Sequence, residues 1–107
     1  MQPSDLLKIE SLDEGWCDKD HVLLHACFQL LVDFVEKEMR PQDYPDWEAT
    51  VKTRSAKKEI EALYAWWQDW KHEGSDKTSS FREDEERYYK ENEMLKRLID
   101  VRMYLWT

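Results

Sequence analysis

The sequence predicts an all-α protein, a three-helix up-down bundle that forms a single domain over residues 1–107. Two Gly and three Pro in 107 residues are too few for the many turns of a small β-sandwich or barrel. Hydrophobic residues make up 41% of the chain, and six residues are Trp, which is enough apolar material for one core. Three stretches place their apolar residues at helical spacing, so we expect three helices joined by short loops.

A lead-in over residues 1–17 precedes the first expected helix, which covers residues 18–39. Asp18 is a favourable N-cap, and Pro41 disfavours any helical continuation. The apolar side chains of this stretch recur at i, i+3 and i+4, which places them on one face. They are Leu24, Cys27, Phe28, Leu31, Phe34 and Val35.

The second and third helices are expected over residues 47–73 and 81–105. The pattern around Thr53 is weak enough to allow a break there, whereas the later part of the second helix has a clear apolar stripe. That stripe consists of Ala56, Ile60, Leu63, Trp67 and Trp70. Ser80 and Glu83 match a capping box at the start of the third helix. Its expected core stripe consists of Tyr88, Leu95, Leu98, Ile99, Met103 and Leu105, with Val101 beside it.

The charge of the chain limits the classes of partner. Sixteen basic and 24 acidic residues give a net charge of −8, which repels nucleic acids and anionic membranes. The sequence has no apolar run of membrane-spanning length and no signal-peptide pattern. Cys17 and Cys27 are ten residues apart, about 15 Å along a helix, so we expect reduced thiols rather than a disulfide. We therefore expect a cytoplasmic protein, and no cofactor is predicted.

One set of side chains predicts a ligand pocket. Arg102 falls among the apolar positions of the third helix, and an enclosed guanidinium must meet a negative group. His25, Trp66 and Arg97 are the residues expected to line a pocket with it, where they could hold a phosphate and stack on a base. Six Trp are also more than a three-helix monomer usually hides, which allows a homodimer with Trp66 or Trp106 at its interface.

A polar stripe on the first helix offers a different chemistry. His21 and His25 are four residues apart, which lets two imidazoles share one metal ion. A zinc hydrolase helix would place Glu after the first of these residues, whereas this chain has Val22. The favoured interpretation is therefore a solvated or inter-helix polar face, with a metal site as the alternative. Helix-borne carboxylates such as Glu59 and Asp100 are interpreted as surface charge that keeps the helices soluble.

The C-terminal part of the chain resembles a known group of proteins. The run Glu93-Met94-Leu95-Lys96-Arg97-Leu98-Ile99, followed by Arg102 and by Leu105-Trp106-Thr107, is similar to the end of small, uncharacterised bacteriophage proteins. That group shares the pattern E-M-L-x-R-L-I-x-x-R-x-x-L-W-T. The first helix of that group is also similar to three stretches of this chain, namely Gly15 to Asp18, Leu24-His25-Ala26 and Phe28 to Glu36. The resemblance covers about half of the chain, implies a phage origin and a host-cytoplasm setting, and brings no catalytic residues.

Together these observations favour a non-catalytic phage accessory protein that acts by binding. The preferred hypothesis is that it sequesters a nucleotide-like host metabolite or immune signal. One alternative is an acidic inhibitor that masks a basic host surface with the carboxylates of residues 84–86. The other alternative is an enzyme, namely a metal-dependent hydrolase that uses His21 and His25.

Overall fold

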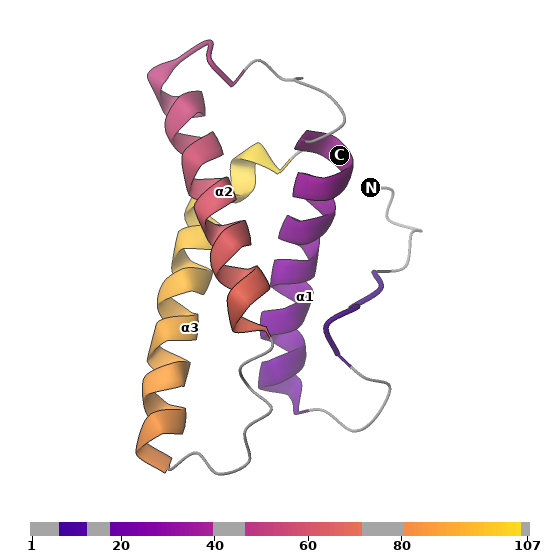
Figure 1. The fold of residues 1–107 in the computed structure, drawn as a ribbon, viewed down its shortest axis with the longest axis vertical. Coiled ribbons are helices and arrows are strands. Elements are labelled where there is room, and N and C mark those ends of the chain that lie inside the picture. The colour runs from indigo at the N-terminus through magenta and orange to yellow at the C-terminus, as the bar shows by residue number, and fades with distance from the viewer. Residues whose placement is uncertain (1–6, 13–17, 40–46, 72–80, 106–107) are drawn as a thin grey trace.

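The protein is a three-helix up-down bundle, as the sequence predicts (Figure 1). The computed structural model describes residues 7–12, 18–39, 47–71 and 81–105, with the backbone alone for residues 81–84. Helices α1 and α3 run in the same direction and α2 runs opposite to both (Figure 1). No strand occurs within the described ranges.

Helix α1 spans Lys19–Phe34 and continues as a π-helical turn over Val35–Met39. Asp18 is the N-cap residue, as predicted, and its backbone is extended, although its side chain makes no capping hydrogen bond. The predicted and observed ends of this helical stretch therefore agree closely. Cys27 is half-buried on α1 with a free thiol, and burial raises the pKa of that thiol above its ordinary value.

Helix α2 spans Val51–Trp70 and begins later than the sequence pattern suggests. The reason is a capping box, in which Thr50 and Thr53 each accept a hydrogen bond from the other's backbone N–H at 3.1 Å. The Thr53 hydroxyl also donates to the Trp47 carbonyl at 2.8 Å. Thr53 therefore fixes the start of the helix and does not break it. Residue 73, where we expected the helix to end, lies outside the described ranges.

Helix α3 spans Phe81–Val101 and is followed by a 3-10 turn over Arg102–Tyr104. The prediction of a helical stretch over residues 81–105 therefore holds to within one residue, with a tighter last turn. The predicted capping residue Ser80 lies outside the described part of the chain. The first half of α3 is tied to the end of α2, because Trp70 Nε1 donates to Glu91 at 2.9 Å and the Arg87 guanidinium lies 4.4 Å from the Trp70 ring centroid.

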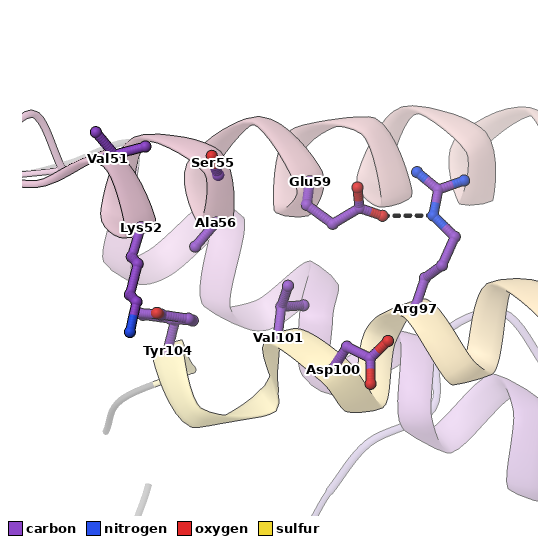
Figure 2. A pocket seen from close by; sticks show the side chains of 9 residues that line it. All are labelled: Val51, Lys52, Ser55, Ala56, Glu59, Arg97, Asp100, Val101 and Tyr104. Carbon is purple, nitrogen blue, oxygen red and sulfur yellow. Dashed lines mark hydrogen bonds and ion pairs between the residues drawn. The ribbon is translucent and has the colours of Figure 1, made fainter.

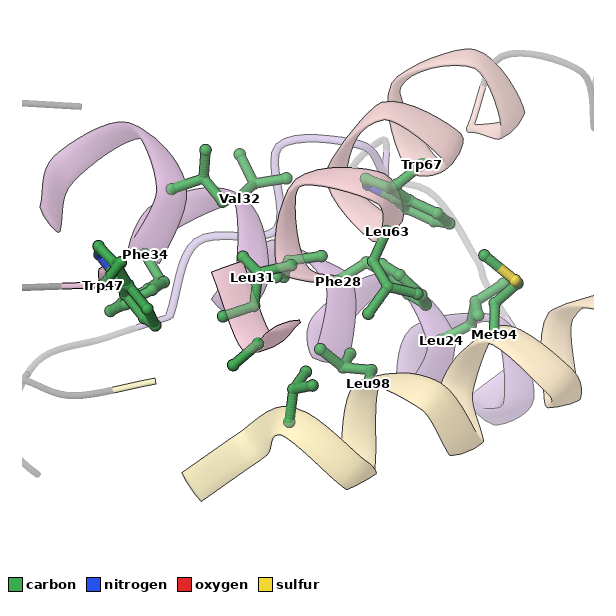
Figure 3. Close-up of a cluster of buried hydrophobic side chains, with 14 residues drawn as sticks. Leu24, Phe28, Leu31, Val32, Phe34, Trp47, Leu63, Trp67, Met94 and Leu98 are labelled. Carbon is green, nitrogen blue, oxygen red and sulfur yellow. The ribbon is translucent and has the colours of Figure 1, made fainter. Parts of the chain in front are cut away.

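One core fills the space between the helices (Figure 3). Its five largest fully buried side chains are Trp67, Phe28, Leu31, Ile60 and Leu63. The Phe28 ring stacks on Trp67 with centroids 4.7 Å apart, and it also meets Trp66 at 5.4 Å. Because stacked and tilted aromatic pairs add to the burial of apolar area, this group holds α1 and α2 together.

The core face of α3 differs from the predicted one. Met94, Leu98 and Val101 are buried, at spacings of four and three. Three residues of the predicted stripe are exposed instead, with 43% of Tyr88, 60% of Ile99 and 69% of Met103 open to solvent. The prediction is wrong for these three residues because α3 carries two apolar stripes. The Met94-Leu98-Val101 stripe is buried against α1 and α2, and in the other stripe Leu95 packs partly against the core.

The lead-in covers the polar stripe of α1. Ser11 Oγ lies 2.6 Å from His25 Nδ1, and the Glu10 backbone N–H donates to Gln29 Oε1 at 3.1 Å. Gln29 also donates to Asp33 at 3.0 Å and is buried. This stripe is therefore a contact face for residues 7–12 as well as part of the inter-helix packing.

Candidate functional site

A groove lies between the first half of α2 and the end of α3 (Figure 2). Its volume is about 490 Å³, which lies within the usual range of small-molecule sites. Helix α2 contributes Val51, Lys52, Ser55, Ala56 and Glu59, and the α3 side contributes Arg97, Asp100, Val101 and Tyr104.

The spacing of these residues explains why the groove exists. Lys52, Ala56 and Glu59 are one helical turn apart on α2, as are Arg97 and Val101 on α3, so each set lines one side of the groove. Small residues at positions 55 and 56 leave room where longer side chains would fill the space between the helices. Ala56 and Val101 are buried, so they form an apolar floor beneath charged walls.

An ion pair between the two helices dominates the electrostatics of the groove. Arg97 Nε donates to Glu59 Oε1 at 2.5 Å (Figure 2). This hydrogen bond raises the pKa of the Arg97 guanidinium above its ordinary value. About a third of each side chain is exposed, so solvent screens the pair and its main effect is to fix the position of the guanidinium.

The remaining donors of Arg97 are available to a ligand. Glu59 accepts from Nε, and Nη1 makes only a weak contact with Met94 Sδ at 3.4 Å. Lys52 and Arg97 balance the formal charges of Glu59 and Asp100, so the groove is locally neutral on a chain of net charge −8. A neutral groove with oriented cationic donors and the Tyr104 ring can hold an anionic group beside an aromatic one.

The structure separates Arg97 from the other three predicted ligand residues at the α2–α3 groove. Arg97 lines the α2–α3 groove, whereas His25, Trp66 and Arg102 do not. His25 and Trp66 both contact the Trp67 ring, at centroid distances of 4.8 Å and 6.1 Å. Trp66 is half-buried and stacks on Trp70 at 5.1 Å, so its ring takes part in the packing around the end of α2.

The prediction that Arg102 is enclosed is wrong. Its side chain is exposed to solvent. The reason is the rotation of α3, which turns Met94, Leu98 and Val101 toward the core and places position 102 on the outside. The other proposed interface residue, Trp106, lies outside the described ranges.

The two histidines of α1 have different surroundings. His25 is half-buried between Ser11 and the edge of Trp67, whereas His21 is exposed. Within the described part of the chain, one group of potential metal ligands gathers, namely Asp18, Asp20 and His21, whose ligand atoms lie within 4.8 Å of one another. All three are exposed, and such acidic surface groups are common without an ion. The structure therefore does not add His25 to this group.

The environment of His25 predicts a dependence of stability on pH. Burial lowers the pKa of His25 below its ordinary value of 6.5, and the nearby His21 lowers it further. The unfolded chain therefore takes up a proton at a higher pH than the folded protein does. We expect full stability above about pH 7 and a progressive loss as the pH falls through 6.5 toward the folded pKa, by at most about 1.4 kcal/mol per pH unit.

Urea unfolding at pH 7.5, 6.5 and 5.5 measures this loss. In His25→Gln the contribution of this group disappears, so the decline should become shallower. His21→Gln is the matched control. It removes the charge of His21, which is the smaller of the two causes that lower the pKa of His25, so most of the loss of stability at low pH should remain. If the free energy of unfolding falls equally with pH in the wild-type protein and in His25→Gln, His25 is not the group responsible.

Part of the groove is predictable from the sequence. Arg97 is one of the predicted ligand residues, whereas Glu59 and Asp100 are predicted to be solubilising carboxylates. Lys52 and Tyr104 are not among the predicted site residues. The apolar stripe Ala56-Ile60-Leu63 is the sequence feature that points to the Glu59–Arg97 ion pair. Because this stripe is buried, it places Glu59 at the edge of the α2 face that meets α3.

Comparisons with known proteins give no relative. No protein-family model, no curated protein and no solved structure matches this chain. Among the residues that the structure describes, no helix is both long enough and apolar enough to span a bilayer.

Proposed function

We propose that this protein is a non-catalytic binding protein and that the α2–α3 groove is its ligand site. The ligand class is a small anionic molecule with an aromatic ring, as in nucleotides. The observation that carries the proposal is the Arg97 guanidinium, held by Glu59 at the groove while its terminal nitrogens can donate to a phosphate.

The other residues of the groove fit the same ligand class. Lys52 supplies a second cation, and Tyr104 supplies a ring edge or face for a base. Asp100 can accept from the hydroxyl or amino groups of a nucleoside. The likeness of the C-terminal run to phage proteins supports a role in an infected cell, where the captured molecule would be a host metabolite or immune signal.

Thermal unfolding with a panel of mononucleotides, cyclic dinucleotides and ADP-ribose tests this function. A bound member should stabilise the fold by about 2.7 kcal/mol at 100 times its Kd, because it binds the folded state alone. If no member of the panel raises the melting temperature, the proposed nucleotide-binding function is wrong.

Variants of the groove locate the site. Arg97→Gln should weaken binding about tenfold or more, because a planar guanidinium can make two hydrogen bonds to one phosphate. Lys52→Gln should weaken binding less, because an ammonium group acts as a point charge and loses a single contact. Arg54→Gln is the matched control, since Arg54 is an exposed arginine on α2 outside the groove. Isothermal titration with the stabilising nucleotide measures each affinity, and equal losses for Arg54→Gln and Arg97→Gln would contradict the assignment.

A further inference from the structure

The outer face of α3 carries an apolar stripe that lies largely outside the core. Tyr88, Ile99 and Met103 are exposed and Leu95 is half-buried, while the core takes Met94, Leu98 and Val101. Exposed large apolar side chains on one face of a helix indicate a surface for another protein. This face is separate from the α2–α3 groove, because none of these four residues lines it.

The spacing along this face is that of a coiled-coil seam. Six positions follow one another at intervals of three, four, three, four and three residues, which is the a/d pattern of a heptad. They are Glu85, Tyr88, Asn92, Leu95, Ile99 and Arg102. Five of them are exposed, whereas Leu95 is half-buried and packs partly against the core, so most of the seam is open to a partner.

The charges at the two ends of the seam select its partner. Glu85 begins the seam and Arg102, in the 3-10 turn, ends it, and each side chain is exposed. A second copy placed antiparallel, with a two-fold axis between Asn92 and Leu95, sets Glu85 of one copy against Arg102 of the other. The same axis sets Tyr88 against Ile99 and Asn92 against Leu95. In a parallel pair, Glu85 would face Glu85 and Arg102 would face Arg102, which is repulsive.

We propose that two copies of this chain associate through the outer face of α3 in this antiparallel register. The interface is isologous, so both Glu85–Arg102 pairs and both Tyr88–Ile99 pairs form together. Arg102 then finds its carboxylate on the second copy rather than in a pocket of its own chain. Glu85 also accepts from the Tyr89 hydroxyl at 3.1 Å, which steadies its carboxylate at the end of the seam.

Sedimentation equilibrium over a range of protein concentrations tests the proposal. The original chain should be a dimer at micromolar concentration. Arg102→Glu and Glu85→Arg should each weaken the dimer about tenfold or more, because two attractive contacts become repulsive. The double variant Glu85→Arg with Arg102→Glu should recover most of the affinity, since it restores opposite charges in the same register.

Two further variants separate the seam from general effects. Ile99→Asp should weaken the dimer by about a hundredfold, because it removes apolar contact and adds a desolvated charge at two symmetric positions. Arg54→Glu makes the same charge change on exposed α2 and should leave the dimer intact. Helical circular dichroism checks that each variant is folded.

Three results would overturn the proposal. One is a wild-type protein that stays monomeric at about 100 µM, which is well above the Kd of a stable dimer. Another is a dimer that Arg102→Glu and Ile99→Asp leave unchanged, which means a different interface. The third is a double charge reversal that stays as weak as either single variant, which excludes the antiparallel pairing.

Discussion

Replacing Phe28 by alanine should lower the free energy of unfolding by about 3–5 kcal/mol. Phe28 is fully buried in the centre of the core, stacked on Trp67 at 4.7 Å and close to Trp66 at 5.4 Å (Figure 3). Its removal leaves a cavity lined by these indoles and takes away their aromatic contacts. Since domains of this size are stable by about 5–15 kcal/mol, the loss is a large share of the total.

Urea unfolding followed by Trp fluorescence and by helical circular dichroism measures this change. Val22→Ala is the matched control on the same helix, because Val22 is exposed and its loss should alter stability by less than about 0.5 kcal/mol. A cost below about 1 kcal/mol for Phe28→Ala would contradict the central place of this ring. A large cost for Val22→Ala would show that the helix itself, rather than the core, had been disturbed.

The helices with one apolar stripe were predictable from the sequence. Leu24, Phe28 and Leu31 on α1 are buried as their spacing indicates. On α2 the stripe residues Ile60, Leu63 and Trp67 are likewise buried. In each case burying that stripe satisfies most of the apolar side chains of the helix, so local periodicity decides which face meets the core.

Helix α3 shows where periodicity is insufficient. Both the Met94-Leu98-Val101 stripe and the Tyr88-Leu95-Ile99 stripe have helical spacing, so either could face the core. Packing against α1 and α2 decides between them, and that information is spread over the whole chain. Because the Met94-Leu98-Val101 stripe is the buried one, Arg102 lies on the surface rather than in the interior. The predicted pocket around an enclosed Arg102 therefore does not form.

The candidate site depends on pairings between distant residues, which a single sequence does not reveal. Glu59 and Arg97 are 38 positions apart, and each has nearer residues of opposite charge on its own helix. The contact of the lead-in with α1 is similar, because Ser11 and His25 meet across 14 positions. Helix register brings these side chains together, so residue types alone could nominate Arg97 but not its partner.

Replacing Gln29 by methionine should detach the lead-in from α1 and lower the free energy of unfolding by about 1–3 kcal/mol. Only 3% of Gln29 is exposed, and its side-chain amide joins the Glu10 backbone N–H at 3.1 Å to the Asp33 carboxylate at 3.0 Å. Methionine has a similar volume and no strong acceptor, so the Glu10 N–H loses its partner while the packing volume is kept. Hydrogen exchange at the Glu10 amide should therefore become faster.

Asp33→Asn is the matched control for this variant. Asparagine still offers an oxygen to the Gln29 amide. The ion pair that it loses, with Lys37 at 3.8 Å, is long and its Lys37 side chain is 73% exposed, so the pair is weak. We expect this control to keep slow exchange at Glu10 and to alter stability by less than about 0.5 kcal/mol. If Gln29→Met leaves the Glu10 amide as protected as before, the hydrogen bond from Gln29 does not hold the lead-in. The cover over His25 must then depend on the contact between Ser11 and His25.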